Sequence, residues 1–256
     1  MLVNRPPDYL MAIWLLSHPL GPRPKGARRA EPTAPARIAE HLGVSRPAAG
    51  EMLTKLESRG LVERGSRKEA LLTAEGRAAA MQVVRRHRLI ERFLTDTLQY
   101  QPWEVHEHVG ALPDAFEPAA LERLYEQLGQ PERCPHGFPI DPDHELRENP
   151  TLTTLGKLSG AGEFVLVRVA EPARDLHQRL AAGGVTIGSS FQRTPCECAD
   201  GLCTFSISGE GIAGVTCLEI GECESLLVRD ASVPEVPARA RCWADILRSE
   251  RHLATS

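Results

Sequence analysis

Histidine and glutamate residues recur at helical spacing in the middle of the chain. His87 and Glu91 are four residues apart, so on an α-helix they lie on one face, one turn from each other. A second histidine-rich stretch, Val105-His106-Glu107-His108, follows. Imidazole nitrogens and carboxylate oxygens that converge in this way are suitable ligands for divalent transition metals. The spacing therefore predicts metal-site geometry in this segment.

Cysteines form the second group that could bind a metal. The chain has 7 cysteines, an odd number that does not suggest a disulfide framework. Cys196, Cys198 and Cys203 are close together, and their thiolates would favour zinc, an iron-sulfur cluster or copper(I). Three interpretations stay open for this group: incidental reduced thiols, metal or cluster binding, and a thiol redox switch.

The elements before these residues are typical of a winged helix. Residues 8–18 are apolar enough for a first helix, and 35–42 and 46–56 read as two helices joined by a short turn, with Ser45 as an N-cap. Residues 61–64 and 69–73 then read as two short strands around a basic wing turn. A helix-turn-helix followed by a basic hairpin predicts DNA binding.

Charge is unevenly distributed, and its distribution supports this prediction. The chain has a net charge of -4, but residues 1–80 hold 13 Lys/Arg against 8 Asp/Glu. A basic front third on an acidic protein indicates a polyanion-binding domain. The residues that we expect at the DNA interface are Ser45, Arg46, Pro47, Ala48, Glu51, Lys55, Arg64, Arg67 and Lys68.

The rest of the chain reads as a helical layer followed by short strands. A long helix from about 73 to 98, a second from about 102 to 111 and a third over 118–129 form a layer that we expect to dimerise. Later runs alternate with glycine-containing turns, and we expect a small β-barrel; they are 162–169, 184–191, 204–207 and 224–228. A helix over 173–182 interrupts them.

These features together resemble the diphtheria toxin repressor family of metal-dependent transcriptional regulators. The resemblance extends over most of residues 4–228 and implies an α+β fold with three domains and a tail. They are a winged-helix DNA-binding domain (1–75), a helical metal-binding and dimerisation domain with a linker (76–150), a FeoA-like SH3 domain that is a β-barrel (151–230), and a tail (231–256). The linker motif Cys134-Pro135-His136 is similar to one common in the family, and we interpret it as structural.

The resemblance implies two metal sites, of which one is well matched here. His87, Glu91 and His106 fall on the ligands of the ancillary site. Glu171 is a loose counterpart of a carboxylate that the SH3-like domain can contribute, and His108 could join the same site. Iron(II), manganese(II), cobalt or zinc would suit these ligands.

The other, regulatory site departs from the family pattern. Asp8 matches a first-helix ligand, of the type found in the manganese-sensing branch, and Asp114 matches a second position. Gly110 and Pro113 fall on the remaining positions and have no ligating side chain. An alternative alignment with a gap would use Glu104, Glu107 and His108 instead.

The resemblance implies a homodimeric, cytoplasmic regulator that binds a double-stranded DNA operator. Iron(II) or manganese(II) is the expected effector, and repression of metal-homeostasis genes is the expected outcome. A regulator of the same fold that senses an iron-sulfur cluster or redox state through Cys196, Cys198 and Cys203 is the alternative. We expect no membrane partner, because the apolar run 9–20 is too short to cross a bilayer. We also expect no enzyme, because no nucleophile elbow, phosphate-binding loop or metallohydrolase motif is found.

Overall fold

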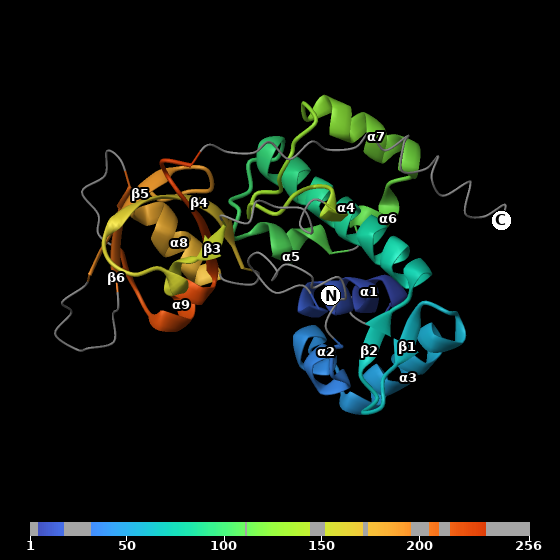
Figure 1. The fold of residues 1–256 in the computed structure, drawn as a ribbon. Coiled ribbons are helices and arrows are strands. Elements are labelled where there is room, and N and C mark those ends of the chain that lie inside the picture. The colour runs from blue at the N-terminus through green and yellow to red at the C-terminus, as the bar shows by residue number, and fades with distance from the viewer. Residues whose placement is uncertain are drawn as a thin grey trace. The chain divides into compact units, whose positions relative to one another are not determined.

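The computed structural model describes residues 5–17, 32–110, 112–143, 152–170, 174–195, 205–209 and 216–233. The chain divides into two compact units, and the division passes through one long helix after His87. Unit 1 comprises residues 1–19, 23–87 and 109–115, and unit 2 comprises 20–22, 88–108 and 116–256. Each unit is described separately below, with the labels of Figure 1.

Unit 1 contains the winged helix that the sequence predicts. Its elements are α1 (Pro6–Ser17), α2 (Pro35–Leu42), α3 (Arg46–Ser58), β1 (Val62–Arg64), β2 (Ala70–Leu72), the first part of α4 (Ala74–Asp96) and α6 (Leu112–Ala115). Figure 1 shows α2 and α3 next to the β1–β2 hairpin. The two strands pair antiparallel with Val62 opposite Leu72 and Arg64 opposite Ala70.

Local sequence signals explain where the helices of unit 1 begin and end. Gly43 ends α2 in the left-handed conformation, with φ +64°. Ser45 then begins α3, because its hydroxyl accepts a hydrogen bond from the backbone N–H of Ala48 at 3.3 Å. Ile38, Leu53 and Leu56 are fully buried, so one apolar face of each helix forms the core between them.

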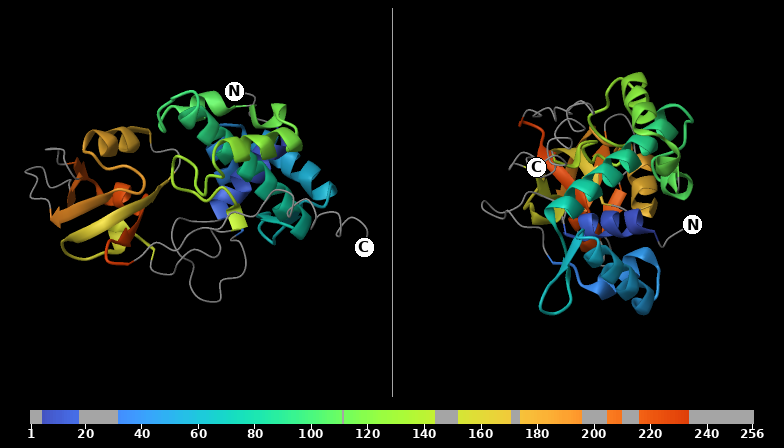
Figure 2. Two further views of the ribbon diagram at one scale, coloured as in Figure 1. Left: turned by 90° about the horizontal axis from the view of Figure 1, so that it is seen from above. Right: turned by 90° about the vertical axis from the view of Figure 1, so that its right-hand side faces the viewer.

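The long helix α4 starts against the hairpin. The Thr73 hydroxyl accepts from the N–H of Gly76 at 3.0 Å and donates to the carbonyl of Gly60. Gly76 is required because a Cβ at this position would overlap the carbonyl oxygen of Leu61. The right-hand view of Figure 2 shows α4 as one continuous helix. Helix geometry alone therefore places His87 one turn before Glu91.

Unit 2 begins with helices. The remainder of α4 is followed by α5 (Val105–Val109) and α7 (Pro118–Gln127), and a loop over residues 134–142 lies almost entirely buried. Leu121 and Tyr125 are the buried positions of α7. The predicted helix over 102–111 is shorter in the structure, because residues 101–104 form a turn before α5.

A region made of one β-sheet and the helices beside it completes unit 2. Its elements are β3 (Thr153–Thr154), a 3-10 turn (Leu155–Lys157), β4 (Gly162–Val169), α8 (Arg174–Ala182), β5 (Ser190–Pro195), β6 (Phe205–Gly209), β7 (Thr216–Leu218), α9 (Ile220–Glu224) and β8 (Leu226–Asp230). The strands form one antiparallel sheet in the order β3-β8-β4-β5-β6-β7.

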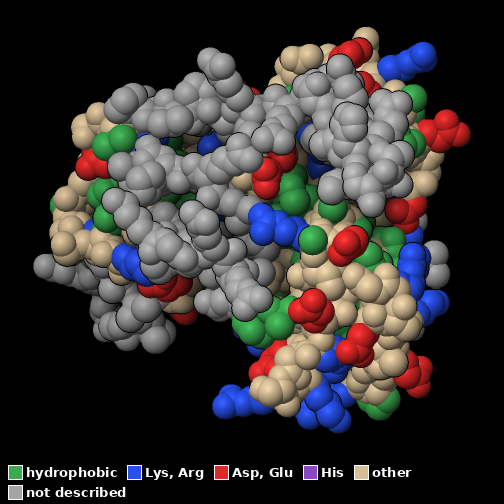
Figure 3. Space-filling view, turned by 45° about the vertical axis from the view of Figure 1, so that its right-hand side comes forward, with side chains coloured by type: hydrophobic (Ala, Val, Ile, Leu, Met, Phe, Trp, Pro, Cys, Tyr) green, Lys and Arg blue, Asp and Glu red, His purple; other side chains and the backbone are tan. Residues whose placement is uncertain are grey.

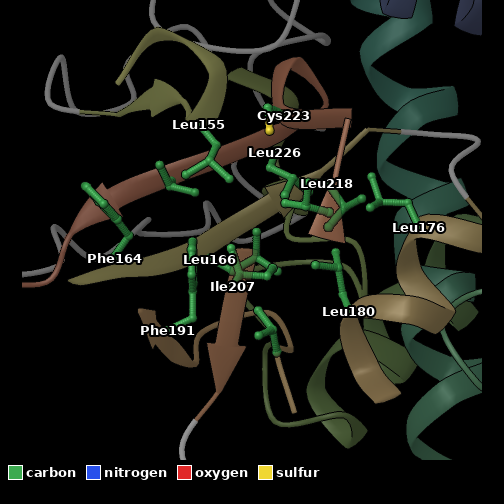
Figure 4. Close-up of a cluster of buried hydrophobic side chains, with 13 residues drawn as sticks. Leu155, Phe164, Leu166, Leu176, Leu180, Phe191, Ile207, Leu218, Cys223 and Leu226 are labelled. Carbon is green, nitrogen blue, oxygen red and sulfur yellow. The ribbon is translucent and has the colours of Figure 1, made fainter. Parts of the chain in front are cut away.

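The core of this region lies between the sheet and its helices. Leu176 and Leu180 of α8 pack with Leu166, Phe191 and Ile207 from three strands, as Figure 4 shows. Among the described strands, no pairing joins β7 to β3, so the sheet is open and the predicted closed barrel is not confirmed. The predicted strand 184–191 also starts later, because Gly184 and Gly188 have positive φ and make turns before β5.

Candidate metal centre and nucleic-acid interface

Glu91 is a carboxylate in the interior of unit 2. Its side chain is fully buried on α4, and its Oε1 lies 3.0 Å from Nε2 of His106 on α5. His87 completes the group, because one ligand atom of each of His87, Glu91 and His106 lies within 4.8 Å of the others. A buried carboxylate that meets two imidazoles fits a divalent ion, which would neutralise the carboxylate charge. The structure therefore brings together the three residues predicted for the ancillary site.

His136 reaches the same carboxylate from another side. Its Nδ1 lies 3.5 Å from Oε2 of Glu91 and 3.9 Å from Sγ of Cys134. Burial acts to lower the pKa of His136, but the charge of Glu91 and hydrogen bonds with Cys134 and Glu91 outweigh it and raise the pKa well above its usual value. The rings of His106 and His136 stack with centroids 4.5 Å apart. Cys134-Pro135-His136 was predicted to be structural from its sequence, which gives no sign that the side chains of Cys134 and His136 lie next to Glu91.

The loop that carries Cys134 and His136 is held by many contacts. The N–H of Cys134 donates to the carbonyl of Phe138 at 2.7 Å, and the N–H of Val169 donates to the carbonyl of His136 at 3.0 Å. Gly137 has φ +89°, and a Cβ there would overlap the carbonyl oxygen of Val167. The guanidinium groups of Arg88 and Arg168 lie over the ring of Phe138. This packing holds the loop backbone in place and so limits where the two side chains can lie.

The two carboxylates at the regulatory-site positions contact an arginine. Arg5 donates from Nη2 to Oδ1 of Asp8 at 2.9 Å and from Nε to Oδ2 at 3.2 Å, and its Nη1 donates to Oδ2 of Asp114. All three residues belong to unit 1. The hydrogen bond with Asp8 is the main reason that the pKa of Arg5 is raised. Asp8 and Asp114 do converge, but on a guanidinium, so this arrangement does not fit a metal ion.

The residues of the gapped alternative have separate partners. Glu104 accepts from the N–H of Gln101 at 3.0 Å, and Glu107 forms an ion pair with Arg174. His108 stacks on Tyr100 with ring centroids 4.3 Å apart. Among the residues that the structure describes, neither metal-type group contains any of these three side chains. The geometry thus favours the ungapped alignment through His106.

Some predicted residues cannot be placed. Glu171, Cys196, Cys198 and Cys203 lie outside the described residues. The prediction of a zinc or cluster site at these cysteines, and of a carboxylate from Glu171, therefore stays a prediction. Cys217 is exposed and Cys223 is buried in the core of the sheet region.

The predicted DNA-contacting residues are mostly on the surface of unit 1. Arg46, Glu51 and Lys55 are exposed on α3, while Arg67 and Lys68 are exposed in the turn of the hairpin. Ser45 and Pro47 are exposed, and Ala48 and Arg64 are half-buried. Figure 3 shows Lys and Arg side chains at the lower end of the view, with Asp and Glu side chains among them.

The wing turn is a defined structure. The N–H of Gly65 donates to the carbonyl of Glu69 at 2.8 Å, and the N–H of Lys68 donates to the carbonyl of Gly65 at 2.9 Å. The Glu69 carboxylate accepts from the N–H of Arg67 at 2.9 Å. These bonds present both cationic side chains at the tip, where phosphate contacts need them.

Two family models match this chain, one over the DNA-contacting residues and one over the metal-ligand residues described above. Residues 1–70 match the family model of the iron dependent repressor N-terminal DNA binding domain, and residues 73–142 match that of the iron dependent repressor metal binding and dimerisation domain. The chain belongs to the iron-dependent repressor family. Members of this family are transcriptional regulators, which confirms the family expected from the sequence and the expectation of a regulator in place of an enzyme.

Two curated relatives show how far the sequence similarity extends. The iron-dependent repressor IdeR of Mycobacterium tuberculosis is 35% identical over 137 residues, which cover 53% of this chain and 56% of that protein. The diphtheria toxin repressor of Corynebacterium efficiens is 37% identical over 105 residues, 41% of this chain and 46% of that protein. The matched part of this chain thus spans about half the length of these relatives.

Solved structures of the family are similar over a longer stretch. A manganese-dependent transcriptional repressor in complex with manganese has a TM-score of 0.70 and 26% identity, covering 88% of this chain and 99% of that one. The manganese regulator SloR has a TM-score of 0.67 and 28% identity, covering 89% and 99%. In the part of the chain that is described, no helix is long and apolar enough to span a bilayer.

Proposed function

We propose that this protein is a homodimeric transcriptional repressor that binds operator DNA through unit 1 when a divalent ion occupies the site of His87, Glu91 and His106. The observation that carries the proposal is the convergence of these three ligands within 4.8 Å in a chain whose first 70 residues match a repressor DNA-binding domain. Iron(II) and manganese(II) are the candidate effectors, because the names of the relatives divide between these metals.

The position of the site suggests how metal binding would affect DNA binding. His87 and Glu91 are on α4, whose first turn is fixed to the β1–β2 hairpin through Thr73 and Gly76. An ion held by α4 and α5 would stabilise one arrangement of these helices. A ligand shifts such an equilibrium by the difference between its affinities for the two states, so the metal would favour the arrangement that fits the operator.

The experiment begins with selection of DNA from a random duplex library by iron(II)-loaded protein in the absence of oxygen. Affinity for the selected duplex is then measured with iron(II), with manganese(II) and with chelator. We expect at least a tenfold loss with chelator. His87→Ala should lose about one metal ion per chain and lose the metal response, because two ligands hold a labile ion poorly.

His108→Ala is the matched control. This histidine is near His106 in sequence but stacks on Tyr100, so its removal should leave metal content and operator affinity unchanged. Loss of metal in His108→Ala with none in His87→Ala would contradict the site and favour the gapped alignment. Selection of no duplex at any metal concentration would contradict the proposed function itself.

We further infer that residues 1–75, 76–150 and 151–230 are three domains, and that the last is FeoA-like and SH3-like. Support comes from the repressor structure similar over 88% of the chain, which includes more than the first two domains. Closure of the sheet into a barrel remains a prediction. The region contacts the helical part of unit 2 through Arg174, which pairs with Glu107, and His177, whose ring meets that of His136.

A further inference from the structure

Glu51 lies on the side of α3 that faces away from the rest of unit 1. The buried hydrophobic positions of this helix are Ala49, Leu53 and Leu56. At about 100° of rotation per residue, the direction opposite these three side chains is that of Glu51. Glu51 itself is exposed, in the second turn of the helix. The second helix of a helix-turn-helix contacts base edges with its N-terminal residues, so a carboxylate lies at the centre of the surface that would meet the bases.

Two hydroxyl groups on the same side of α3 are already bonded within the helix. The Thr54 hydroxyl donates to the carbonyl of Gly50 at 3.1 Å, and the Ser58 hydroxyl donates to the carbonyl of Lys55 at 2.9 Å. Among the residues that the structure describes, the carboxylate of Glu51 has no hydrogen-bond or ion-pair partner. Both oxygens of Glu51 are therefore open to a donor on another molecule.

A carboxylate on a surface that faces DNA is restricted in what it can contact. Phosphates repel it, and its oxygens can only accept, so its partners are the amino groups at base edges. In the major groove these are N4 of cytosine and N6 of adenine, but adenine also places the acceptor N7 beside its amino group. We propose that Glu51 is a base-reading residue that selects cytosine at one position of each operator half-site. This inference rests on the proposed function and specifies the DNA that the protein recognises.

Gly50, the residue before Glu51, is an independent sign that another molecule approaches α3 closely. A glycine inside a helix is less stable than an alanine, and Gly50 does not have a positive φ that would require it. Apart from its own helix backbone, no atom of the described chain lies within 4 Å of the place that its Cβ would take. Arg46, one turn earlier, is exposed and suited to a phosphate. The missing side chain leaves room for a DNA strand and lets Glu51 come near the base edges.

Exposed cations offset the repulsion between Glu51 and DNA. Arg46 and Lys55 are exposed on α3, and Arg67 and Lys68 are exposed in the wing. Their phosphate contacts attract every duplex equally, whereas Glu51 lowers the affinity for any duplex that offers it no amino group. A residue of this kind acts mainly by rejecting wrong sequences. Its removal should therefore change the preference among duplexes more than the affinity for DNA in general.

Selection from a random duplex library by the iron(II)-loaded full chain, without oxygen, tests the proposal in the parent and in Glu51→Gln. We expect the parent to select cytosine at one position of each half-site. Glu51→Gln should select adenine there, because an amide can donate to N7 and accept from N6. Two duplexes that differ only at this base pair should show about a tenfold preference for cytosine in the parent and the reverse in the variant. A gain of affinity for the adenine duplex cannot arise from misfolding.

Glu57→Gln is the matched control. Glu57 is exposed on the same helix but points about a third of a turn away from Glu51, so the variant loses the same charge and should keep the base preference. Gly50→Ala tests the close approach separately. It should raise the melting temperature of the free protein, because alanine favours the helix, yet weaken binding to both duplexes several-fold by the same factor.

The outcomes separate this inference from the proposed function. The same base preference in Glu51→Gln and the parent, with both still binding DNA, would overturn the selection of cytosine and leave the proposed function intact. Operator affinity that is unchanged in Gly50→Ala would refute the close approach on which the contact of Glu51 depends. Failure of the parent to select any duplex would instead contradict the proposed function.

Discussion

Substitution of Gly137 tests how tightly the loop over residues 134–142 packs against β4. Its φ of +89° is unfavourable for any residue with a side chain, and a Cβ would overlap the carbonyl oxygen of Val167 and lie 2.9 Å from Cα of Arg168. The conformational part of the cost is about 1 kcal/mol, and displacement of tightly packed backbone adds about 1–3 kcal/mol. Gly137→Ala should therefore lower the free energy of unfolding of unit 2 by about 2–4 kcal/mol.

Gly129→Ala is the matched control for this change. Gly129 has φ +75°, but no atom lies within 4 Å of the place that its Cβ would take. Its substitution should cost only the conformational part, about 1 kcal/mol. Urea unfolding followed by circular dichroism gives both values, with the slope of the transition checked for equality. The difference between the losses of unfolding free energy in the two variants gives the cost of disturbing the contact between the loop and β4.

The metal content of the Gly137→Ala and Gly129→Ala variants tests the effect of the loop on function. Because His136 of this loop contacts Glu91 and stacks on His106, Gly137→Ala should also weaken manganese(II) binding at the site of His87, Glu91 and His106, while Gly129→Ala should not. Equal destabilisation by the two substitutions would refute the reasoning, since it would mean that the loop can move away from Val167 at no cost. Normal metal binding in a strongly destabilised Gly137→Ala would separate the role of the loop in stability from its role in ligand placement.

Three further predictions concern unit 1 and the cysteines. Arg67→Glu with Lys68→Glu should weaken binding to all duplexes and reduce its salt dependence, because both side chains are exposed at the wing; unchanged operator affinity would exclude the wing from the interface. Ser45→Ala should cost about 1 kcal/mol of stability in urea unfolding, because it removes the bond to Ala48 that begins α3, whereas a loss near zero would show that the cap is not used. Burial raises the pKa of Cys223 to about 11, so this thiol stays protonated up to that pH in the folded chain. Mass spectrometry after thiol alkylation at neutral pH should find Cys217 modified and Cys223 unmodified, and equal modification would contradict the burial.

The sequence was most informative where structure is local. Turn and cap residues such as Gly43 and Ser45 placed α2 and α3 correctly, and the four-residue spacing on α4 placed His87 next to Glu91. Strand 162–169 was also predicted with its observed bounds. Residues 184–189 were wrongly assigned to a strand, because an apolar run next to glycine has the same composition in a turn as in a strand.

Contacts between distant segments could not be read from the pattern. Cys134 and His136 follow Glu91 by more than forty residues, and only the folded loop turns them toward its carboxylate. Arg5 lies before the first helix and had no motif, so nothing in the sequence paired it with Asp114. A clue existed in each case, since a buried carboxylate and a pair of acidic positions without their usual neighbours both require a compensating positive charge.

That requirement connects the two sites of the chain. Glu91 is fully buried, and its charge can be neutralised either by protonated His136, whose pKa is raised, or by a metal ion. These two cations compete for the same carboxylate. Asp8 and Asp114 are partly exposed and are neutralised by Arg5, a group that does not dissociate from the chain. Among the residues that the structure describes, the groups that could exchange one cation for another therefore lie around Glu91. Within the described residues, a response to metal would therefore originate at α4 and α5, with α1 already held by the charge of Arg5.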